Sequence, residues 1–511
     1  MQNNDKKVLL RISNLKQYFP LKGGRFVKAN DGITLDIYEG ETFGLVGESG
    51  CGKSTLGRTI LQLYHQTYGR TMYYGRSLDD LAPKYVIDTV KNLKARRTKL
   101  RELEQKRDKL EADYAKLSEK EQYAKHGELD TARKLAEDAL LDITKIVGGF
   151  LVVDDLDPVI AAYSKDYAIA RKLSSMEEKR QELLVDVDDA EYAKKAAEEA
   201  GKSGKDDQLQ KAQEKLKQCD DQIAALRAQL DAGRKEIEAL RVPYANDPEF
   251  QKYEAYRDDG IDLARLEYNE MRRLRSDMQL IFQDPYSSLN PRMSVGQIIS
   301  EGMQAHNMIK KKDARMQQLV LNIMDECGLA PYFLHRFPHQ FSGGQRQRIG
   351  IARALATNPK FVVCDEAVSA LDVSIQAQII NLLLDLKEHQ NLTYMFITHD
   401  LSVVKYISDR VGVMYLGNMV ELAEADEIFH HPIHPYTEAL LNAIPTTDTV
   451  GAKELSILEG DIPSPVNPPK GCKFHTRCKY CTEICTQVVP AWEEVRPNHF
   501  VACHHKLEVK E

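Results

Sequence analysis

Aromatic residues, long apolar runs and signal-peptide features are scarce in this sequence. Only 7% of its 511 residues are aromatic, with one tryptophan, Trp492. No apolar run approaches the roughly 18 residues that indicate a membrane-spanning helix. The N-terminal stretch MQNNDKKVLLRISNLK is too polar for the apolar core of a secretory signal peptide. We therefore expect a cytosolic chain whose role at a membrane would depend on partner proteins.

A strong excess of charge is also missing. Lys and Arg total 70 and Asp and Glu 77, a net charge of −7, which does not favour coating of nucleic acid by bulk charge. Nine cysteines in so long a chain do not indicate a disulfide scaffold. The length allows two to five domains of roughly 100–200 residues, so a large core is available.

Composition divides the chain into four stretches. Residues 1–81 carry short β-like runs and a glycine-rich turn, and residues 82–268 consist mostly of Lys, Glu, Arg, Asp, Ala and Leu. Residues 269–430 return to apolar runs separated by turns, and residues 431–511 are rich in Pro, His and Cys. This pattern predicts an α/β domain that is interrupted by a helical insert and followed by a small cysteine-rich domain.

The insert contains a seven-residue apolar repeat over residues 209–240. Such a repeat keeps one stripe of a helix against a partner helix. Glycines at 148–149 and between 201 and 204 would let the chain turn back. We interpret the insert as an antiparallel coiled coil or short bundle, and a single charged helix solvated on all sides is the alternative. The two positions of the repeat are Leu209, Leu216, Ile223, Leu230, Ile237 and Ala212, Cys219, Leu226, Gly233, Leu240.

A phosphate-binding loop follows the apolar strand at residues 43–46. It has the pattern G-x-x-x-x-G-K-[ST] and leads into an apolar-periodic helix. Its glycines let backbone N–H groups converge on phosphate oxygens at a helix N-terminus. We expect Lys53 to bridge the β- and γ-phosphates and the Ser54 hydroxyl to bind Mg²⁺. The nucleotide-binding residues expected in this loop are Gly47, Glu48, Ser49, Gly50, Cys51, Gly52, Lys53, Ser54 and Thr55.

Further elements follow downstream in a fixed order. An apolar strand, Phe361–Asp365, ends in two carboxylates. Asp365 would hold Mg²⁺ through water, and Glu366 would orient and polarise the attacking water. The paired glycines of the segment 341–348 precede a helix and make a second anion site. His399 ends another apolar strand, where its imidazole could contact a γ-phosphate.

These elements together resemble the ATP-binding cassette (ABC) ATPases. In that family's terms the chain has a Walker A loop, a Q-loop glutamine, an FSGGQ signature, a Walker B strand, a D-loop and a switch histidine. The resemblance implies a P-loop domain with a RecA-like core, an antiparallel β subdomain and a helical signature subdomain. It also implies that each ATP lies between one subunit's Walker A loop and another's signature. The matching positions are Gly47–Ser54, Gln283, Phe341–Gln345, Phe361–Asp365, Ser369–Asp372 and His399.

The resemblance assigns roles to individual residues. Glu366, His399, Gln283 and Lys53 would be catalytic, and Gln283 would bind Mg²⁺ together with Ser54 and Asp365. An aromatic residue before the Walker A loop usually stacks on adenine, and Tyr18 and Phe19 both qualify, with an ordinary strand residue as the alternative for either. The residues that would serve the partner's nucleotide are Ser342, Gly343, Gly344, Gln345 and Asp372.

Narrower motifs resemble the oligopeptide/dipeptide importers. They lie at residues 281–292, 371–378 and 434–441 and in the tail from 462 to 504. This resemblance implies an ATP-hydrolysing subunit at the cytoplasmic side of the cell membrane, peripheral to it. Its partners would be a paralogous or identical ATPase, two transmembrane permeases and, indirectly, an extracytoplasmic peptide-binding protein.

The chain departs from that family in two places. Gly47 and Gln283 are 236 positions apart, where the family needs only several tens, because the helical insert lies between them. The residues after Glu366 are Ala367-Val368 instead of Pro-Thr or Pro-Val, which removes no catalytic group. The insert could also serve as an arm for a partner that the sequence does not identify.

The tail gathers five of the nine cysteines. Thiolates at these spacings could ligate an iron–sulfur cluster or zinc, and metal-free thiols are a third alternative. The family resemblance implies a [4Fe–4S] cluster, with Cys481 as an extra cysteine and zinc favoured next because His475 and His504 lie close by. The four matching positions are Cys472, Cys478, Cys485 and Cys503.

A rival function is that of the DNA-maintenance ABC ATPases, which also interrupt the domain with a coiled coil. Those proteins generally place the coil after the Q-loop and carry a CxxC hook at its hinge. Here the insert precedes Gln283 and its only cysteine is Cys219. We therefore expect peptide import and no nucleic-acid partner.

Overall fold

The computed structural model describes residues 6–117, 119–200, 206–310, 313, 315–443 and 460–507. The chain divides into two compact units. Unit 1 combines Met1–Gly75 with Arg272–Glu511, and unit 2 is Arg76–Met271. The expected insert, residues 82–268, lies inside unit 2, and the turn glycines expected between 201 and 204 lie outside the described residues.

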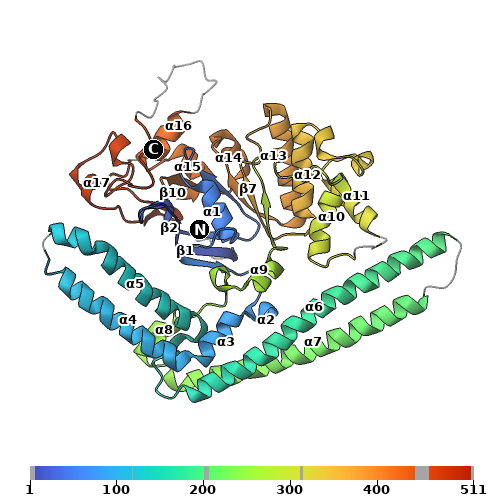
Figure 1. Cartoon of the computed structure of the whole chain (residues 1–511), viewed down its shortest axis with the longest axis horizontal. Helices are drawn as coiled ribbons and strands as arrows, with labels where there is room; N and C mark the ends of the chain where they lie inside the picture. The colour runs from blue at the N-terminus through green and yellow to red at the C-terminus, as the bar shows by residue number, and fades with distance from the viewer. Residues whose placement is uncertain are drawn as a thin grey trace. The chain divides into compact units, whose positions relative to one another are not determined.

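A mixed sheet is the centre of unit 1 (Figure 1). Its strands follow the order β11-β12-β10-β9-β3-β8-β7-β6. The five strands from β9 to β6 run parallel to their neighbours, and the pairs β9–β10, β10–β12 and β12–β11 are antiparallel. The bounds are β3 Thr42–Val46, β6 Met278–Ile281, β7 Phe361–Asp365, β8 Thr393–Ile397, β9 Arg410–Tyr415, β10 Asn418–Glu424, β11 Glu493–Arg496 and β12 His499–Val501.

The parallel strands are apolar because both of their faces are covered. Every residue of β3, β7 and β8 is buried, which is typical of central strands in an α/β sheet. The helices of this part of the chain are α1 Lys53–Ile60, α13 Val373–Gln390, α14 Leu401–Ile407, α15 Ala425–His430 and α16 Pro435–Asn442. The α/β fold class expected from the sequence is confirmed.

A second, antiparallel sheet belongs to the same unit. Three of its strands, β1 (Val8–Pro20), β2 (Phe26–Tyr38) and β4 (Tyr68–Tyr73), lie in the order β2-β1-β4. Register shifts interrupt the pairing of β1 with β2, for example between Gln17 and Tyr18. This sheet corresponds to the antiparallel β subdomain of the expected fold.

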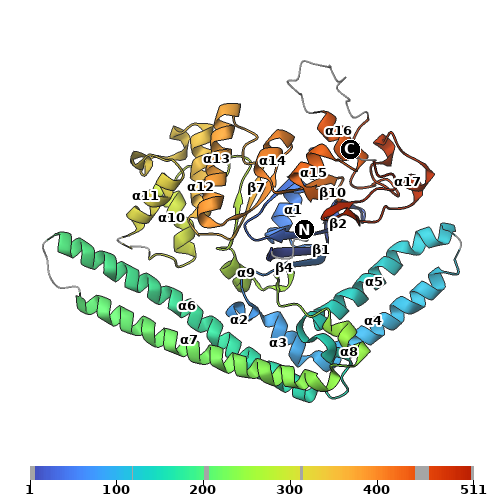
Figure 2. The same ribbon diagram turned by 180° about the vertical axis from the view of Figure 1, so that it is seen from behind.

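A helical group follows the strand β6 in the sequence. It consists of α10 (Val295–Ala305), α11 (Met316–Glu326) and α12 (Gly343–Leu355), which pack with α13 (Figure 2). Their apolar side chains form one buried cluster together with side chains of β7 and β8. The helix α12 begins at the paired glycines. It packs against β6, the strand at the edge of the main sheet.

The described C-terminal residues add strands to the main sheet. The strand β12 pairs with β10, and the backbone N–H of Ala502 donates to the carbonyl of Val420 at 2.9 Å. A short helix, α17 (Glu483–Gln487), lies in the cysteine-rich part of this segment. The described part of 431–511 thus belongs to unit 1.

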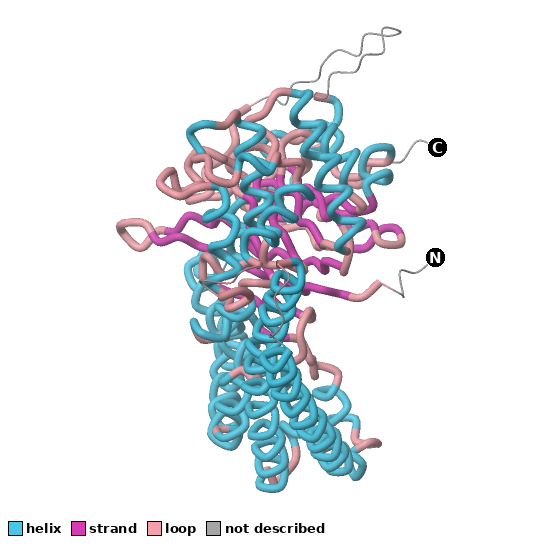
Figure 3. The backbone as a smooth tube through the Cα atoms, turned by 90° about the vertical axis from the view of Figure 1, so that its right-hand side faces the viewer, coloured by secondary structure: helices cyan, strands magenta, loops and turns pink. Residues whose placement is uncertain are grey.

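Unit 2 is almost entirely helical in its described residues, as the cyan tube in Figure 3 shows. The helices α6 and α7 lie side by side along their length (Figures 1 and 2), and contacts such as Lys165–Glu236 and Lys194–Asp206 fix their antiparallel direction. The helices α4 and α5 pack on each other in the same way. The bounds are α2 Leu78–Leu81, α3 Lys84–Lys91, α4 Leu93–Tyr114, α5 Glu119–Val147, α6 Asp157–Glu199, α7 Asp206–Arg241, α8 Pro248–Glu254, β5 Ile261–Asp262 and α9 Tyr268–Leu274.

The apolar repeat of residues 209–240 lies on the face of α7 that packs against α6. Cys219, Ile223 and Leu230 form a buried cluster with Ala170 and Leu173 of α6. Gly233 is buried because its Cα lies against Asp166, where a Cβ would come within 2.8 Å of the carboxylate. The turn predicted at Gly148-Gly149 is the short 3-10 helix η1 (Gly148–Val152).

None of the helices in the described part of the chain combines the length and the apolarity needed to cross a membrane.

Candidate active site

Four parts of the predicted site lie at the ends of four neighbouring parallel strands. The Walker A loop follows β3, His399 follows β8, Asp365 ends β7 and Gln283 follows β6. Because the carboxyl ends of parallel strands meet at the same edge of a sheet, these residues gather there although they are distant in sequence. The sheet order β3-β8-β7-β6 therefore assembles the site.

Two glycines of the Walker A loop are required by close backbone contacts. Gly52 has φ +102°, and a Cβ on it would lie 2.1 Å from the carbonyl oxygen of Ala29. Gly47 has φ +150°, and a Cβ on it would lie 2.2 Å from the carbonyl oxygen of Met414. The loop is also tied to β2, because the Asn30 amide donates to the Gly52 carbonyl at 3.1 Å. Both β2 and β9 thus fix the path of the loop.

Lys53 folds its ammonium group back into the Walker A loop. The Nζ atom donates to the carbonyls of Gly47 at 2.7 Å and Glu48 at 3.0 Å, and the side chain is buried. These two carbonyl bonds compensate for the burial of a charged group. A phosphate oxygen is a stronger acceptor for the same ammonium, so the position suits a triphosphate.

Ser54 and Asp365 meet across the site. The Ser54 hydroxyl donates to Asp365 Oδ1 at 2.5 Å, and the Arg58 guanidinium donates to Asp365 Oδ2 at 3.1 Å. A hydroxyl and a carboxylate are hard oxygen ligands of the kind that Mg²⁺ prefers, so this pair fits the ion. The sequence interpretation did not include Arg58. It lies one helical turn after Ser54 on α1, and that spacing could have indicated it.

Glu366 lies between Gln283 and His399. The Gln283 amide donates to Glu366 Oε2 at 2.6 Å, and His399 Nδ1 lies 3.6 Å from Glu366 Oε1. Glu366 has φ +48°, an uncommon backbone conformation for a residue with a side chain. Its backbone N–H donates to the Ile397 carbonyl of the neighbouring strand at 2.9 Å, which supports that conformation. Its carboxylate, with a glutamine and a histidine beside it, suits the orientation of a water nucleophile.

The signature residues begin the helix α12. The Ser342 hydroxyl accepts from the backbone N–H of Gln345 at 3.4 Å, and the Gln345 side chain accepts from the backbone N–H of Ser342 at 3.2 Å. This capping box satisfies the first turn of the helix. Gly344 is buried against Ile375, whereas Ser342 is exposed and Gly343 half-buried. The exposed end of α12 is accessible to a second molecule.

Asp372 of the D-loop caps the helix α13. Its carboxylate accepts from the backbone N–H of Ile375 and from the Ser374 hydroxyl, both at 3.0 Å. The Ile375 bond, followed by the Ser374 bond, lowers the pKa of this carboxyl. The structure thus gives Asp372 a helix-capping role in addition to any contact with nucleotide.

Tyr18 and Phe19, neighbours on β1, have different contacts. The Tyr18 hydroxyl donates to Asp31 Oδ1 at 2.5 Å, whereas Phe19 packs edge-to-face on Tyr64 with 5.3 Å between ring centres. The backbone N–H of Asp31 donates to the Gly417 carbonyl, and the Gly417 N–H donates to the carbonyl of Cys51 in the Walker A loop. Tyr18 is therefore connected to that loop by a short chain of hydrogen bonds.

The four tail cysteines lie near one another in the C-terminal segment. The backbone N–H of Cys472 donates to the Cys485 carbonyl at 2.8 Å. Burial raises the pKa of the Cys503 thiol to about 12, and the nearby Cys472, Cys478 and Cys485 add to that rise. Within the described residues, no group of three or more His, Cys, Asp or Glu side chains could hold a metal ion. The described side chains therefore give no support to the expected [4Fe–4S] or zinc site.

The sequence interpretation also missed the residues that hold Glu48. The Glu48 backbone N–H donates to the Tyr436 hydroxyl at 2.9 Å, and both carboxylate oxygens accept from Arg477. Arg477 is 429 positions from Glu48. The motif at residues 434–441 was visible in the sequence, but its contact with the Walker A loop was not.

Comparison with known proteins gives two family matches. The model described as "ABC transporter" matches residues 30–251 and 250–369, and the model described as "Oligopeptide/dipeptide transporter, C-terminal region" matches residues 420–485. The solved structure of cbiO1 from Clostridium perfringens, part of an ABC transporter complex, is 16% identical with a TM-score of 0.42. It covers 83% of this chain and 92% of its own chain, and this likeness is too distant to bear on function.

Three curated relatives have a higher sequence identity to this chain than the solved structure has. The oligopeptide transport ATP-binding protein AppF of Bacillus subtilis is 52% identical over 48% of this chain and 75% of its own length. The oligopeptide transport ATP-binding protein OppF of Salmonella typhimurium is 52% identical over 48% and 73%. YkfD of Bacillus subtilis is 35% identical over 98% of both chains, so that similarity includes residues of unit 2.

Proposed function

This chain belongs to the ABC transporter family, in the group that carries the oligopeptide/dipeptide transporter C-terminal region, and we propose that it hydrolyses ATP to energise an importer of oligopeptides or dipeptides. The observation that carries this proposal is the contact of Glu366 with Gln283 at the strand edge where Ser54 meets Asp365. This edge joins a water-orienting carboxylate to the residues suited to phosphate and Mg²⁺.

The chain's own residues divide the work of hydrolysis. Lys53 and the backbone N–H groups of its loop bind the β- and γ-phosphates of ATP, which is the substrate. Ser54, Asp365 and Gln283 would hold Mg²⁺, which when bound offsets the negative charge that develops on the transferred phosphoryl group. Glu366 orients and polarises the water that attacks the γ-phosphate, and His399 donates a hydrogen bond near that phosphate.

Tyr18 is the better candidate for stacking on adenine. Its hydroxyl is held by Asp31, which is bonded through Gly417 to the Walker A loop. Phe19 makes an edge-to-face contact with Tyr64, and the Tyr18 ring makes a tilted contact with Tyr68. A fixed ring beside the loop is what a stacking platform requires.

The active form pairs this chain with a second ATPase subunit, either paralogous or identical. The signature turn, with Ser342 exposed and Gly343 half-buried, would contact the partner's ATP. The assembly would lie at the cytoplasmic side of the membrane beneath two permeases, and a peptide-binding protein outside the membrane would deliver the substrate. The relatives named above do not favour the DNA-maintenance alternative, since two of them are named as oligopeptide transport proteins.

The test of the catalytic assignment is the substitution Glu366→Gln. The variant should bind ATP as the wild type does and lose at least about 100-fold in ATPase turnover of the assembled transporter, because an amide cannot polarise the attacking water. Glu388→Gln, at an exposed position on α13, is the matched control and should keep full turnover. Full turnover in Glu366→Gln would contradict the role given to this carboxylate.

We propose separately that the four tail cysteines ligate a metal cofactor, with a [4Fe–4S] cluster ahead of zinc. Their mutual influence on the thiol pKa values supports a common neighbourhood, and thiolates are the ligands of both groups. Iron and acid-labile sulfide should be found in protein purified without oxygen. Zinc at one per chain without iron would replace the cluster by zinc, and the absence of both would leave free thiols.

A further inference from the structure

The C-terminal segment holds the Walker A loop through a nearly buried ion pair. The guanidinium of Arg477 donates to both carboxylate oxygens of Glu48, at 2.7 and 3.0 Å. The Arg477 side chain is 5% exposed and that of Glu48 is 23% exposed. A bidentate pair of this kind fixes the position and the orientation of both groups, because two parallel hydrogen bonds must be satisfied together.

The same residue of the loop is held a second time through its backbone. The Glu48 N–H donates to the hydroxyl of Tyr436 on α16. The Tyr436 ring is fully buried and packs on Tyr415 and on Phe474, with ring centres 4.8 and 5.3 Å apart. Phe474 and Arg477 belong to one short turn. That turn therefore supports the Glu48 side chain through Arg477, and its backbone through the packing of Phe474 on Tyr436.

The other end of this turn reaches the adenine side of the site. The Lys473 ammonium lies 3.2 Å from Asp31 Oδ2, and the other carboxylate oxygen of Asp31 accepts from the Tyr18 hydroxyl. Burial alone would raise the pKa of Asp31, but Lys473, then the Tyr18 hydroxyl and then Lys16, which lies 3.5 Å from Asp31 Oδ1, outweigh it and lower the pKa to about 2. Asp31 therefore stays ionised and links Lys473 to the Tyr18 ring.

We infer that the turn of residues 473–477 positions both the phosphate-binding loop and the adenine-binding ring for the bound nucleotide. Arg477 acts as a positioning residue for the phosphate-binding loop through Glu48. Lys473 acts as a positioning residue for the base through Asp31 and Tyr18. The inference rests on the proposed function, because it assumes that ATP occupies this loop and that Tyr18 stacks on its adenine.

The two contacts have separable consequences for ligand binding. Phosphates are bound whether or not a base is attached, so a loop displaced by loss of Arg477 weakens ATP and inorganic triphosphate alike. The Tyr18 ring serves only the base, so loss of Lys473 weakens ATP and spares triphosphate. A general loosening of the C-terminal segment would weaken both ligands in either variant.

The experiment compares the dissociation constants of Mg-ATP and of magnesium triphosphate for the full-length chain. Arg477→Met should weaken the binding of both ligands by about 10-fold. Arg477→Lys should weaken their binding less, because lysine keeps an ion pair with Glu48 but cannot form the two parallel hydrogen bonds of arginine. Lys473→Met should weaken ATP by about 5-fold and leave triphosphate within about 2-fold. Arg496→Met is the matched control, since Arg496 pairs with Glu427 in the same C-terminal segment at 3.6 Å and is 42% exposed.

Several outcomes would overturn the inference. It is wrong if Arg477→Met binds both ligands as tightly as the wild type, or if Arg496→Met loses as much affinity. The adenine role of Lys473 is wrong if its variant weakens both ligands equally. Should Arg477→Met fail to fold, Glu48→Gln breaks the same pair from the other side and must show the same loss. Failure of the wild type to bind Mg-ATP would instead refute the proposed function.

Discussion

At the scale of single residues, the site depends on side chains and glycines that occupy positions with little freedom. Lys53 is buried and bonded to two carbonyls of its own loop, and Glu366 has a positive φ that the neighbouring strand stabilises. Such residues tolerate few changes, because a substitution alters the backbone or leaves a buried polar group without its bond.

Gly52→Ala should destabilise unit 1 far more than Gly50→Ala. Both glycines have positive φ, which costs an alanine about 1 kcal/mol. A Cβ at Gly50 meets nothing within 4 Å, whereas at Gly52 it overlaps the Ala29 carbonyl, so the loss there should reach about 3 kcal/mol. Urea unfolding of the two variants measures the difference, and equal losses would show that the overlap is relieved at no cost.

His434 should make the stability of unit 1 depend on pH. It is fully buried and accepts from the Tyr436 backbone N–H, and burial lowers its pKa to about 4 although the Glu421 carboxylate opposes the shift. Above pH 6.5 both the folded and the unfolded chain carry a neutral His434. As the pH falls toward 4, the unfolded chain binds a proton that the folded chain does not, so stability is lost.

The expected loss from this residue is about 2 kcal/mol between pH 7.5 and pH 5. His434→Asn keeps an acceptor for the helix cap and cannot titrate, so its stability should fall by about 2 kcal/mol less over the same range. Urea unfolding at the two pH values gives both numbers. Identical losses in the wild type and the variant would rule out His434 as the source.

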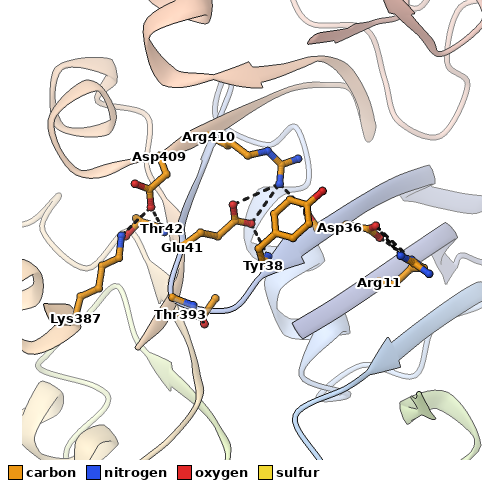
Figure 4. Close-up of polar contacts among 10 residues, drawn as sticks. Arg11, Asp36, Tyr38, Glu41, Thr42, Lys387, Thr393, Asp409 and Arg410 are labelled. Atoms are coloured by element: carbon orange, nitrogen blue, oxygen red, sulfur yellow. Dashed lines mark hydrogen bonds and ion pairs between the residues drawn. The ribbon is translucent and has the colours of Figure 1, made fainter. Parts of the chain in front are cut away.

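At the scale of elements, the strand β3 is anchored at both ends. Its carboxyl end leads into the Walker A loop, and its amino end lies in the polar network of Figure 4. There the Thr42 N–H donates to Asp409 at 2.7 Å, and Arg410 Nη1 lies 3.4 Å from both oxygens of Glu41. This network fixes β3 against β9 and so fixes where the loop begins.

Arg410→Met should destabilise unit 1 by about 3–5 kcal/mol. It leaves the carboxylate of Glu41, which is 3% exposed, buried without its cation. Burial already raises the pKa of Glu41 even beside Arg410, and the variant should raise that pKa further. Arg11→Met breaks the exposed pair with Asp36 and should cost less than about 1 kcal/mol. Equal costs in chemical unfolding would show that the network does not depend on burial.

At the scale of the whole molecule, each of the two units has buried clusters of its own in the described part of the chain. Two of these clusters consist of residues of unit 2, and two others consist of residues of unit 1. The two ends of unit 1 that flank unit 2 meet at Lys360. Its ammonium donates to the Gly75 carbonyl, and its backbone N–H donates to the Asp277 carbonyl at 2.8 Å.

Replacing residues 77–270 by a short Gly-Ser linker should therefore leave unit 1 folded. The affinity for Mg-ATP should stay within about threefold of the wild type, because the cost of closing a loop depends only weakly on its length. Circular dichroism and nucleotide binding measure the two properties. A variant that is unfolded or binds no ATP would show that the nucleotide site requires unit 2.

The sequence alone identified the motifs of the candidate site, because these motifs are short and their spacing follows from local geometry. The Walker A glycines are recognisable from the turn that they form, and the carboxylates from the apolar strand before them. The apolar repeat of α7 is recognisable from its seven-residue period. Predicting an α/β fold with a helical insert needed nothing more than these patterns. Arg58 was within reach of the same reasoning, since it lies one helical turn from Ser54.

Only the tertiary structure decided which distant residues support that chemistry. The pairs Arg477–Glu48 and Lys473–Asp31 join positions more than 400 residues apart, and no local pattern encodes a contact that the return of the chain onto its own sheet creates. The same holds for the tail cysteines, whose spacing suggests metal ligands, because only the folded chain brings the Cys472 N–H to the Cys485 carbonyl. Local spacing specifies which groups a segment offers, and packing decides which of those groups meet and in which charge state.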